Sequence, residues 1–243
     1  MKFAIVTGGT KGIGKEISRK LLIRRFSVIA VHNDEDTDES ARATVQEFNS
    51  EYKNLYYPVK CDLSVTDNIP YLFAEVRSLT ESLDILILNA GKTIRKGITD
   101  MTIEEWESVF TMNITTPLFL IQRFLPVLNK DSNIIFTGSS MAQFPHSVSL
   151  SYGITKSAVH SMVKNLVKFL VPYDIRVNCV SPGFVDTEWQ KNKPQEIRES
   201  INRKISLNRF AKPEEVASAY IFILDNQYLN GAIITVDGGY SFK

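Results

Sequence analysis

The stretch TGGTKGIG, residues 7–14, follows an apolar, strand-like run and opens a segment of helical periodicity. Its glycines Gly8, Gly12 and Gly14 have the spacing G-x-x-x-G-x-G. In a strand–turn–helix unit the first glycine allows a tight turn and the second lets the backbone approach a pyrophosphate. The third lets the helix pack closely on the sheet. The turn therefore predicts a dinucleotide site at the first strand-to-helix connection of a doubly wound α/β fold.

Strand-like and helix-like segments alternate along the 243 residues, without a linker or a shift in composition. Most of the strand-like segments are continuously apolar, as are strands that a parallel sheet buries on both faces. We therefore predict a single α/β domain, residues 1–243, with a seven-stranded, doubly wound (Rossmann-like) parallel sheet and helices on both faces. The expected strands are 3–7, 27–32, 55–60, 84–88, 133–138, 175–180 and 232–236, and the expected helices are 12–25, 38–50, 66–80, 102–128, 152–170 and 213–225.

The composition excludes several classes of function. The net charge is +1, without a basic block or an acidic tail, so neither nucleic acid nor an anionic membrane is an expected partner. Cys61 and Cys179 stand alone and no Cys/His cluster has zinc spacing, so we expect no metal and two buried thiols in a reducing compartment. The first apolar run is too short for a signal peptide, and no segment reaches the ~20 apolar residues of a spanning helix. A cytoplasmic location is expected.

Tyr152 and Lys156 lie four residues apart and share one face of a predicted helix. YYPVK gives Tyr56 and Lys60 the same spacing, but the proline between them and the strand character exclude a helix there. Only Tyr152 also has a serine, Ser139, thirteen residues before it. The reference pKa of tyrosine is about 10, and a cation one helical turn away is expected to lower it by favouring the phenolate.

These motifs together resemble the short-chain dehydrogenase/reductase family, in its short single-domain branch, over essentially the whole chain. Besides the glycine turn and the Tyr152/Lys156 pair, the resemblance rests on CDL (61–63), LNAG (88–91), MNITT (112–116), FTGSS (136–140), NCVSPGFVDT (178–187) and VDGGY (236–240). It implies an NAD(P)-dependent oxidoreductase that transfers a hydride between a nicotinamide and a carbonyl or secondary alcohol. A protein that binds the coenzyme as a sensor, without catalysis, is the alternative from another functional class. The presence of all four catalytic residues of the family, named below, disfavours it.

The resemblance implies four catalytic residues: Asn113, Ser139, Tyr152 and Lys156. Tyr152 would be the general acid/base, Lys156 would hold the nicotinamide ribose, and Ser139 would bind the substrate oxygen. Asn113 would anchor a water and complete a proton relay to Lys156. The expected coenzyme contacts are Gly8, Thr10, Lys11, Gly12, Ile13, Gly14, His32, Asn33, Asp62, Leu63, Asn89, Ala90, Gly91, Tyr152, Lys156, Pro182, Gly183, Val185 and Thr187.

The second strand favours NADP over NAD. NAD binders often carry an acid near the end of this strand for the ribose 2′-hydroxyl, and here Val31 holds that position. Lys11, inside the glycine turn, adds a cation that suits a 2′-phosphate. Asp34 and Glu35 would oppose that phosphate if they pointed inward. NADPH is therefore the expected coenzyme, with NAD as the alternative.

The substrate is expected between the loop 140–151 and a partly helical flap at about 184–210. The predicted pocket residues are Met141, Phe144, His146, Phe184 and Trp189. They give the pocket an apolar character, and no acid or arginine stands out as a substrate clamp. A small ketone, a sugar and an acyl thioester all remain open.

NAGKTIRKGITDMTIEEW (89–106) resembles the 3-oxoacyl-carrier-protein reductase subgroup. That subgroup tends to carry arginines for its acidic carrier protein, and the aligned positions here are Asn133 and the vicinity of Tyr173. A carrier-protein substrate is therefore the alternative rather than the first expectation.

The helices predicted at 102–128 and 152–170 show apolar residues around much of their surface, which indicates a homotetramer or homodimer. His160 is expected to serve packing or a subunit contact. The residues beyond one sheet-facing stripe are Phe119, Leu120, Phe124, Val163, Val167 and Phe169.

Overall fold

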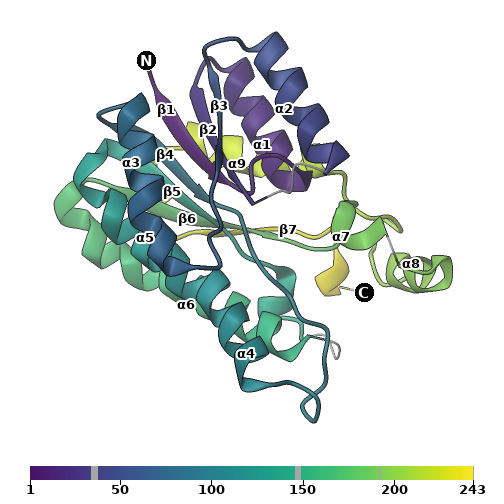
Figure 1. Cartoon of the computed structure of the whole chain (residues 1–243). Helices are drawn as coiled ribbons and strands as arrows, with labels where there is room; N and C mark the ends of the chain where they lie inside the picture. The colour runs from purple at the N-terminus through teal and green to yellow at the C-terminus, as the bar shows by residue number, and fades with distance from the viewer. Residues whose placement is uncertain (34–37, 146–148, 192, 243) are drawn as a thin grey trace.

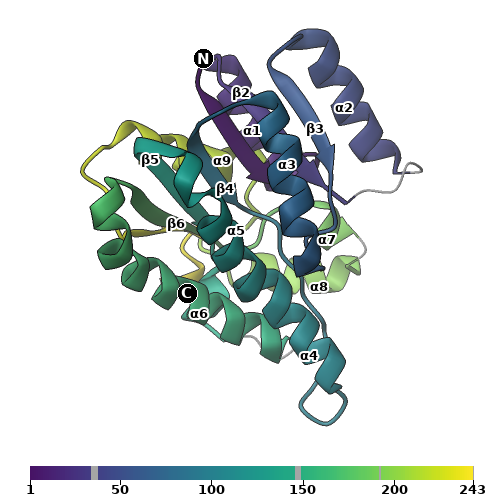
Figure 2. The same cartoon turned by 60° about the vertical axis from the view of Figure 1, so that its left-hand side comes forward.

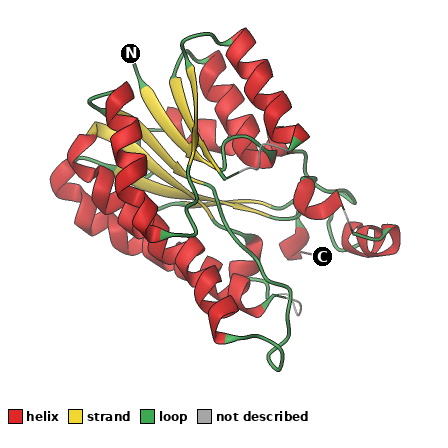
Figure 3. Cartoon of the chain, in the orientation of Figure 1, coloured by secondary structure: helices red, strands yellow, loops and turns green. Residues whose placement is uncertain are grey.

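The computed structural model describes residues 1–33, 38–145, 149–191 and 193–242 (Figure 1). Seven parallel strands form one sheet in the order β3-β2-β1-β4-β5-β6-β7, seen in yellow at the centre of Figure 3. This confirms the predicted doubly wound α/β fold. The strands are β1 Phe3–Thr7, β2 Ser27–His32, β3 Tyr56–Lys60, β4 Leu83–Leu88, β5 Leu128–Thr137, β6 Arg176–Pro182 and β7 Ile233–Val236.

Helices cover both faces of the sheet because its strands are apolar on both sides. In β1, Ala4 and Val6 point into the layer of α1, α2 and α9, while Ile5 points into the layer of α3, α5 and α6. Figure 2 brings the second layer to the front. The helices are α1 Gly12–Ile23, α2 Glu39–Glu51, α3 Ile69–Leu79, α4 Ile103–Phe110, α5 Thr116–Phe124, α6 Leu150–Leu170, α7 Glu188–Lys191, α8 Gln195–Asn202 and α9 Pro213–Asp225.

The strand order reverses between β1 and β4, which lie side by side in the sheet. The chain leaves β1 toward β2 and β3, but leaves β4 toward β5, β6 and β7. The loops after these two strands therefore diverge and open a crevice at the carboxyl edge of the sheet. All the motifs of the sequence that carry chemistry lie along this edge or on the helices that begin there.

The helix predicted over 102–128 is wrong in its extent. It is divided into α4 and α5 by a π-helical turn, Thr111–Thr115, and β5 already begins at Leu128. A π turn admits one extra residue without breaking the helical hydrogen-bond ladder, so an apolar periodicity does not disclose it. The turn places Asn113, which is 2% exposed, against α6 rather than toward solvent.

Three of the residues assigned to an excess apolar surface belong to the core instead. Leu120, Phe124 and Val163 are at most 1% exposed and pack between the sheet and its helices. Phe119 and Phe169 are 44% and 73% exposed, so these two do remain at the surface. Within the described residues, no helix combines the length and apolarity needed to cross a membrane.

Candidate active site

The glycine turn connects β1 to α1 and forms one wall of a cavity of about 380 Å³. Gly12 has a φ of +52°, a conformation that side chains other than glycine rarely adopt. A Cβ atom at Gly14 would lie 2.0 Å from the carbonyl oxygen of Gly8, so the turn can fold onto the helix only with glycine there. Gly12 and Ile13, at the start of α1, line the cavity, and the side chain of the N-cap residue, Lys11, does not cap this end of the helix. The first amides of a helix have no partner within it, so such a helix start can bind phosphate oxygens.

Most of the predicted coenzyme residues surround this same cavity. They come from the turn after β1, the end of β4 and the segment after β6. Those that line it are Gly8, Lys11, Gly12, Ile13, Asn89, Ala90, Gly91, Tyr152, Lys156, Pro182, Gly183, Val185 and Thr187.

Six predicted coenzyme residues do not line the cavity, but they lie along the same sheet edge. Thr10 is buried beneath the turn, and Gly14 packs against Gly8. His32 ends β2 and Asn33 follows it, while Asp62 and Leu63 follow β3.

The loop after β3 is held by hydrogen bonds within it and by one from α5. Asp62 accepts hydrogen bonds from the amide and the hydroxyl of Ser64, at 2.9 and 2.7 Å. The hydroxyl of Thr116 donates to the backbone oxygen of Leu63 at 2.9 Å. These contacts fix the position of the loop that carries the expected coenzyme residues Asp62 and Leu63.

Lys11 reaches from the glycine turn toward the first turn of α2. Its Nζ lies 2.7 Å from Oδ2 of Asp38, and this contact lowers the pKa of that carboxyl. Asp38 also caps α2 by accepting a hydrogen bond from the amide of Ala41 at 3.0 Å. The cation that the sequence offers to a 2′-phosphate therefore has a neighbouring carboxylate. Asp34 and Glu35 lie outside the described residues.

Tyr152, Lys156 and Ser139 meet at the inner end of the cavity. The first two project from one face of α6, and Ser139 follows the end of β5. Ser139 Oγ accepts a hydrogen bond from the amide of Met141 at 3.2 Å. This contact orients the hydroxyl and leaves its proton available for another acceptor.

The ammonium of Lys156 is buried under the sheet edge. Its Nζ donates a hydrogen bond of 2.6 Å to the backbone oxygen of Thr137 and lies 5.4 Å from the centroid of the Tyr152 ring. Burial lowers the pKa of Lys156 to about 8, because the charged form loses its hydration.

The expected lowering of the Tyr152 pKa is wrong for this structure. Burial raises it to about 12, and a hydrogen bond with Ser139 opposes that rise only in part. The phenolate is the charged form, so it loses its hydration in the buried site. Burial also lowers the pKa of Lys156, the cation that was expected to favour the phenolate. Tyr152 is therefore a protonated phenol at neutral pH.

Asn113 serves as a clamp for the loop after β4. Its side chain accepts a hydrogen bond from the amide of Lys92 at 2.8 Å and donates to the carbonyl oxygen of the same residue at 2.9 Å. It also donates to Oγ1 of Thr155 at 3.0 Å. A Cβ atom at Gly91 would lie 3.3 Å from Oδ1 of Asn113 and 3.7 Å from Nζ of Lys156. Asn113 and Lys156 therefore both lie close to Gly91. The water-mediated relay from Asn113 to Lys156 stays a prediction.

The outer part of the cavity has an apolar wall, which only some of the predicted pocket residues form. Met141, Phe184 and Trp189 line it, and Phe144 does not. The Trp189 ring meets the Tyr152 ring edge-on, with centroids 6.2 Å apart. His146 lies outside the described residues.

Sequence reasoning missed the charged and polar residues of the outer cavity. Arg95 lines it from the loop after β4, and Lys193 lines it from the flap, whereas the sequence singles out no arginine as a substrate clamp. Their loops have no periodicity from which their course could be predicted. The other missed lining residues are Thr93, Met112, Thr137, Gly138, Ser140, Ser149, Glu188 and Gln190.

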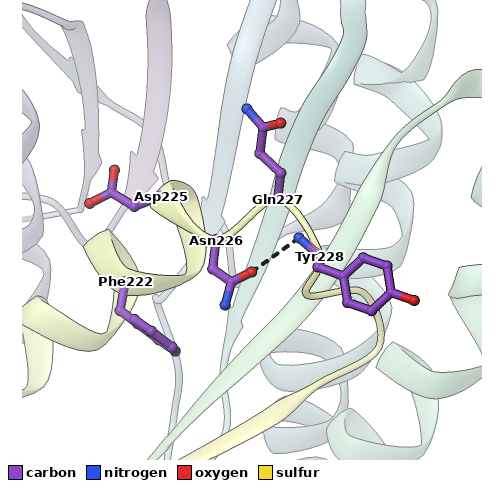
Figure 4. Close-up of a pocket in the computed structure, with 5 residues that line it drawn as sticks. All are labelled: Phe222, Asp225, Asn226, Gln227 and Tyr228. Atoms are coloured by element: carbon purple, nitrogen blue, oxygen red, sulfur yellow. Dashed lines mark hydrogen bonds between the residues drawn. The ribbon is translucent and has the colours of Figure 1, made fainter.

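A second hollow lies at the end of α9 and is shown in Figure 4. Its side chains point in different directions rather than toward one another, and Asp225 is bound by Arg24. It therefore offers no converging groups for catalysis. In the described part of the chain, no three His, Cys, Asp or Glu side chains come together as a metal site.

Comparisons with known proteins agree with this geometry. A family model described as enoyl-(acyl carrier protein) reductase matches residues 8–241. A 3-oxoacyl-[acyl-carrier-protein] reductase of Aquifex aeolicus is 33% identical over 98% of this chain and 96% of the relative. A short-chain dehydrogenase/reductase from Serratia marcescens superposes with a TM-score of 0.91 at 26% identity, covering 99% of this chain and 98% of that one. A short-chain dehydrogenase from Burkholderia cenocepacia in complex with NADP gives 0.90 at 25% identity, with the same coverage. The chain therefore belongs to the short-chain dehydrogenase/reductase family and is an oxidoreductase acting on CH–OH or carbonyl groups.

Proposed function

We propose that this enzyme is an NADPH-dependent reductase that converts a small carbonyl substrate into a secondary alcohol, with Tyr152 as the general acid. The observation that carries the proposal is the meeting of Tyr152, Lys156 and Ser139 in one cavity with the glycine turn. An acid, a cation and an oxygen-binding hydroxyl thus surround one point, next to a phosphate-binding helix start.

The residues of the cavity fit a nicotinamide dinucleotide. The turn leaves no room for a Cβ atom at Gly14 and only 3.1 Å between a Cβ at Gly12 and Thr187, so the backbone is bare where a pyrophosphate would lie. Lys156 would hold the ribose of the nicotinamide, and Pro182, Gly183 and Thr187 would border its ring. The bound coenzyme would supply the hydride.

The side chains of the chain itself handle the proton and the developing charge. The raised pKa of Tyr152 keeps the phenol protonated at neutral pH, as donation to an alkoxide requires. Ser139 Oγ, already accepting from Met141, donates its own proton toward the substrate oxygen. Lys156 places a positive charge beneath the tyrosine ring, which favours the phenolate that remains after the proton has left.

NADPH is the proposed coenzyme. Val31 is buried at the end of β2, where NAD binders often place an acid, and Lys11 lines the cavity. The NADP complex of the similar Burkholderia protein supports the same choice.

A 3-oxoacyl thioester on a carrier protein is the second candidate substrate, and the Aquifex relative favours it. Against it, the position where that subgroup carries an arginine is Asn133, which is 2% exposed within the sheet and cannot meet a docking protein. Comparing acetoacetyl thioesters of carrier protein and of N-acetylcysteamine separates the two. A preference of at least about tenfold in kcat/KM for the carrier-protein form would favour this second candidate.

We also propose a homo-oligomer, in which Phe119 on α5 and Phe169 on α6 are covered by another copy. These helices carry exposed apolar side chains that a monomer would leave in water. Light scattering tests this, and a monomer at micromolar concentration contradicts it.

The test of the central proposal is the oxidation of NADPH with a panel of small diketones and acetoacetyl thioesters. Tyr152→Phe removes only the acidic hydroxyl, so we expect NADPH binding to persist while kcat falls by about 10³-fold or more. Tyr57→Phe is the matched control, because that hydroxyl donates to the backbone oxygen of Asn54 on the edge strand β3, outside the cavity. Retained turnover in Tyr152→Phe with bound coenzyme would refute the proposal.

A further inference from the structure

The outer cavity carries more positive charge than its carboxylates can balance. Among the described residues that line it, Arg95 and Lys193 are the cations of the substrate end, and Glu188 is the only acid. Glu188 is itself engaged in an ion pair with Lys191. The substrate end therefore has an unbalanced positive charge beside an apolar wall.

Trp189 links Arg95 to Tyr152, the proposed acid. Arg95 follows β4 in the loop that Asn113 clamps, and its guanidinium donates to the backbone oxygen of Trp189 at 3.2 Å. The ring of Trp189 in turn contacts the Tyr152 ring at 6.2 Å between centroids. A substrate whose carbonyl lies at Tyr152 thus extends past the tryptophan to reach the arginine.

Lys193 approaches the same point from the flap. Burial lowers the pKa of Lys193, and the positive charge of Arg95 lowers it further. The two cations therefore repel each other in a partly desolvated part of the cavity. In the described ranges of the chain, neither one forms an ion pair with a carboxylate. Nearby cations behave differently, since Lys96 pairs with Glu105 and Arg198 with Asp186.

Two like charges held together without a counter-ion cost free energy, and a bound anion would recover it. An arginine fork with a neighbouring ammonium suits a group with several negatively charged oxygens. We propose that the substrate carries, besides its carbonyl, a carboxylate or phosphate group that Arg95 and Lys193 bind at the cavity mouth. This inference rests on the proposed reductase function and specifies its substrate class.

The test compares matched substrates that differ only in the anionic group. Levulinate and methyl levulinate form the carboxylate pair, and dihydroxyacetone phosphate and dihydroxyacetone form the phosphate pair. For at least one pair, we expect kcat/KM to favour the anionic form by about tenfold or more, mainly through KM. The preference should shrink as salt rises, because part of it is electrostatic. The pair with the larger preference identifies the anion.

The variants Arg95→Gln and Lys193→Gln test the two side chains. Each should lower the ratio of anionic to neutral kcat/KM by about tenfold, and the double variant should bring it close to one. Lys204→Gln is the control, since it removes the same charge from an exposed flap position outside the cavity. Levulinate titrated calorimetrically into the complex with NADP gives a readout independent of turnover, and its affinity should fall in the same two variants.

Two results would overturn the inference while leaving the proposed function standing. One is equal turnover of the anionic and neutral forms in both pairs. The other is a drop in both forms alike in Arg95→Gln and Lys193→Gln. Failure of the proposed function has a different signature, namely NADPH binding without reduction of either form of any substrate, and it would remove this inference as well.

Discussion

The Nζ of Lys156 lies 2.6 Å from the backbone oxygen of Thr137, so the proposed catalytic helix is fastened to the end of β5. Ser139 follows two residues later on the same chain segment. The end of β5 therefore fixes the positions of both Lys156 and Ser139. The position of Tyr152 relative to Ser139 depends on the same strand end. A disturbance of residues 137–139 should consequently affect binding and proton transfer together.

The pH dependence of coenzyme affinity should report the buried Lys156. Its pKa is lowered to about 8, so the free enzyme holds the ammonium below pH 8 and loses it above. If the charged form binds the ribose, the Kd for NADPH rises by about twofold from pH 7 to 8 and by about tenfold from pH 7 to 9. Fluorescence titration of NADPH measures this.

Lys156→Arg provides the comparison for that titration. A guanidinium stays charged throughout the range, so its binding should be weaker but without the rise above pH 8. A Kd for the unsubstituted enzyme that is flat from pH 7 to 9.5 would contradict the role of the ammonium.

Gly138 is packed too closely to accept a side chain. A Cβ atom there would lie 2.6 Å from Nε2 of His160 and 2.7 Å from Sγ of Cys179. Gly138→Ala should therefore reduce the free energy of unfolding by about 1–3 kcal/mol and lower kcat by displacing Ser139. Urea denaturation measures the first effect.

Gly153→Ala is the matched control, because Gly153 lies within α6 and a Cβ there would be 3.7 Å from the backbone oxygen of Met141, an ordinary contact. It should be neutral or stabilise by up to about 1 kcal/mol. Combining Gly138→Ala with His160→Ala should cost less than the sum of the single changes, since the second opens the space that the first needs. Additive costs would mean that the clash lies elsewhere.

The sequence was sufficient for elements with clear boundaries. Strand β2 and helix α9 occupy the predicted residues, because a buried β-branched run marks the first and Pro213 with two acids marks the second. The doubly wound parallel sheet followed from the alternation of apolar strands with helices and from the glycine turn. Tyr56 and Lys60 lie in β3, as the proline between them indicated.

Features that depend on tertiary contacts escaped prediction. The π turn at Asn113 leaves the apolar periodicity intact, so one long helix was expected where two lie. Arg95 and Lys193 meet because two loops distant in sequence come together, and neither loop has a pattern that determines its course. The pKa of Tyr152 depends on the depth of its burial, which outweighs the helical spacing to Lys156.

His160 should make the protein sensitive to acid. It is 7% exposed, its Nε2 has no hydrogen-bond partner among the described residues, and its pKa is lowered to about 4 by burial and then by Lys156 and Lys164. Because the folded pKa lies below the unfolded value of about 6.5, unfolding takes up a proton as pH falls through this window. The group should remove about 2 kcal/mol of stability between pH 7 and 4.5.

His160→Leu isolates that contribution from the titration of carboxylates. The difference between the unsubstituted protein and this variant in the free energy of unfolding should change by about 2 kcal/mol between the two pH values, in favour of the variant at pH 4.5. Urea denaturation at both values provides the measurement. A difference independent of pH would show that the imidazole titrates normally in the fold.

The ion pair between Lys11 and Asp38 should set the strength of the preference for NADPH. Lys11 lies within the glycine turn and lines the cavity, and its Nζ is 2.7 Å from the Asp38 carboxylate, which competes with a phosphate for it. Lys11→Gln should lower the ratio of NADH Kd to NADPH Kd by about tenfold, because one contact to the 2′-phosphate is lost. Asp38→Asn should raise that ratio several-fold, since asparagine still caps α2 but no longer competes with the phosphate. Glu47→Gln is the control, because that carboxylate pairs with Lys15 and Arg19 outside the cavity. NADH binding more tightly than NADPH in the unsubstituted enzyme would reject the coenzyme assignment.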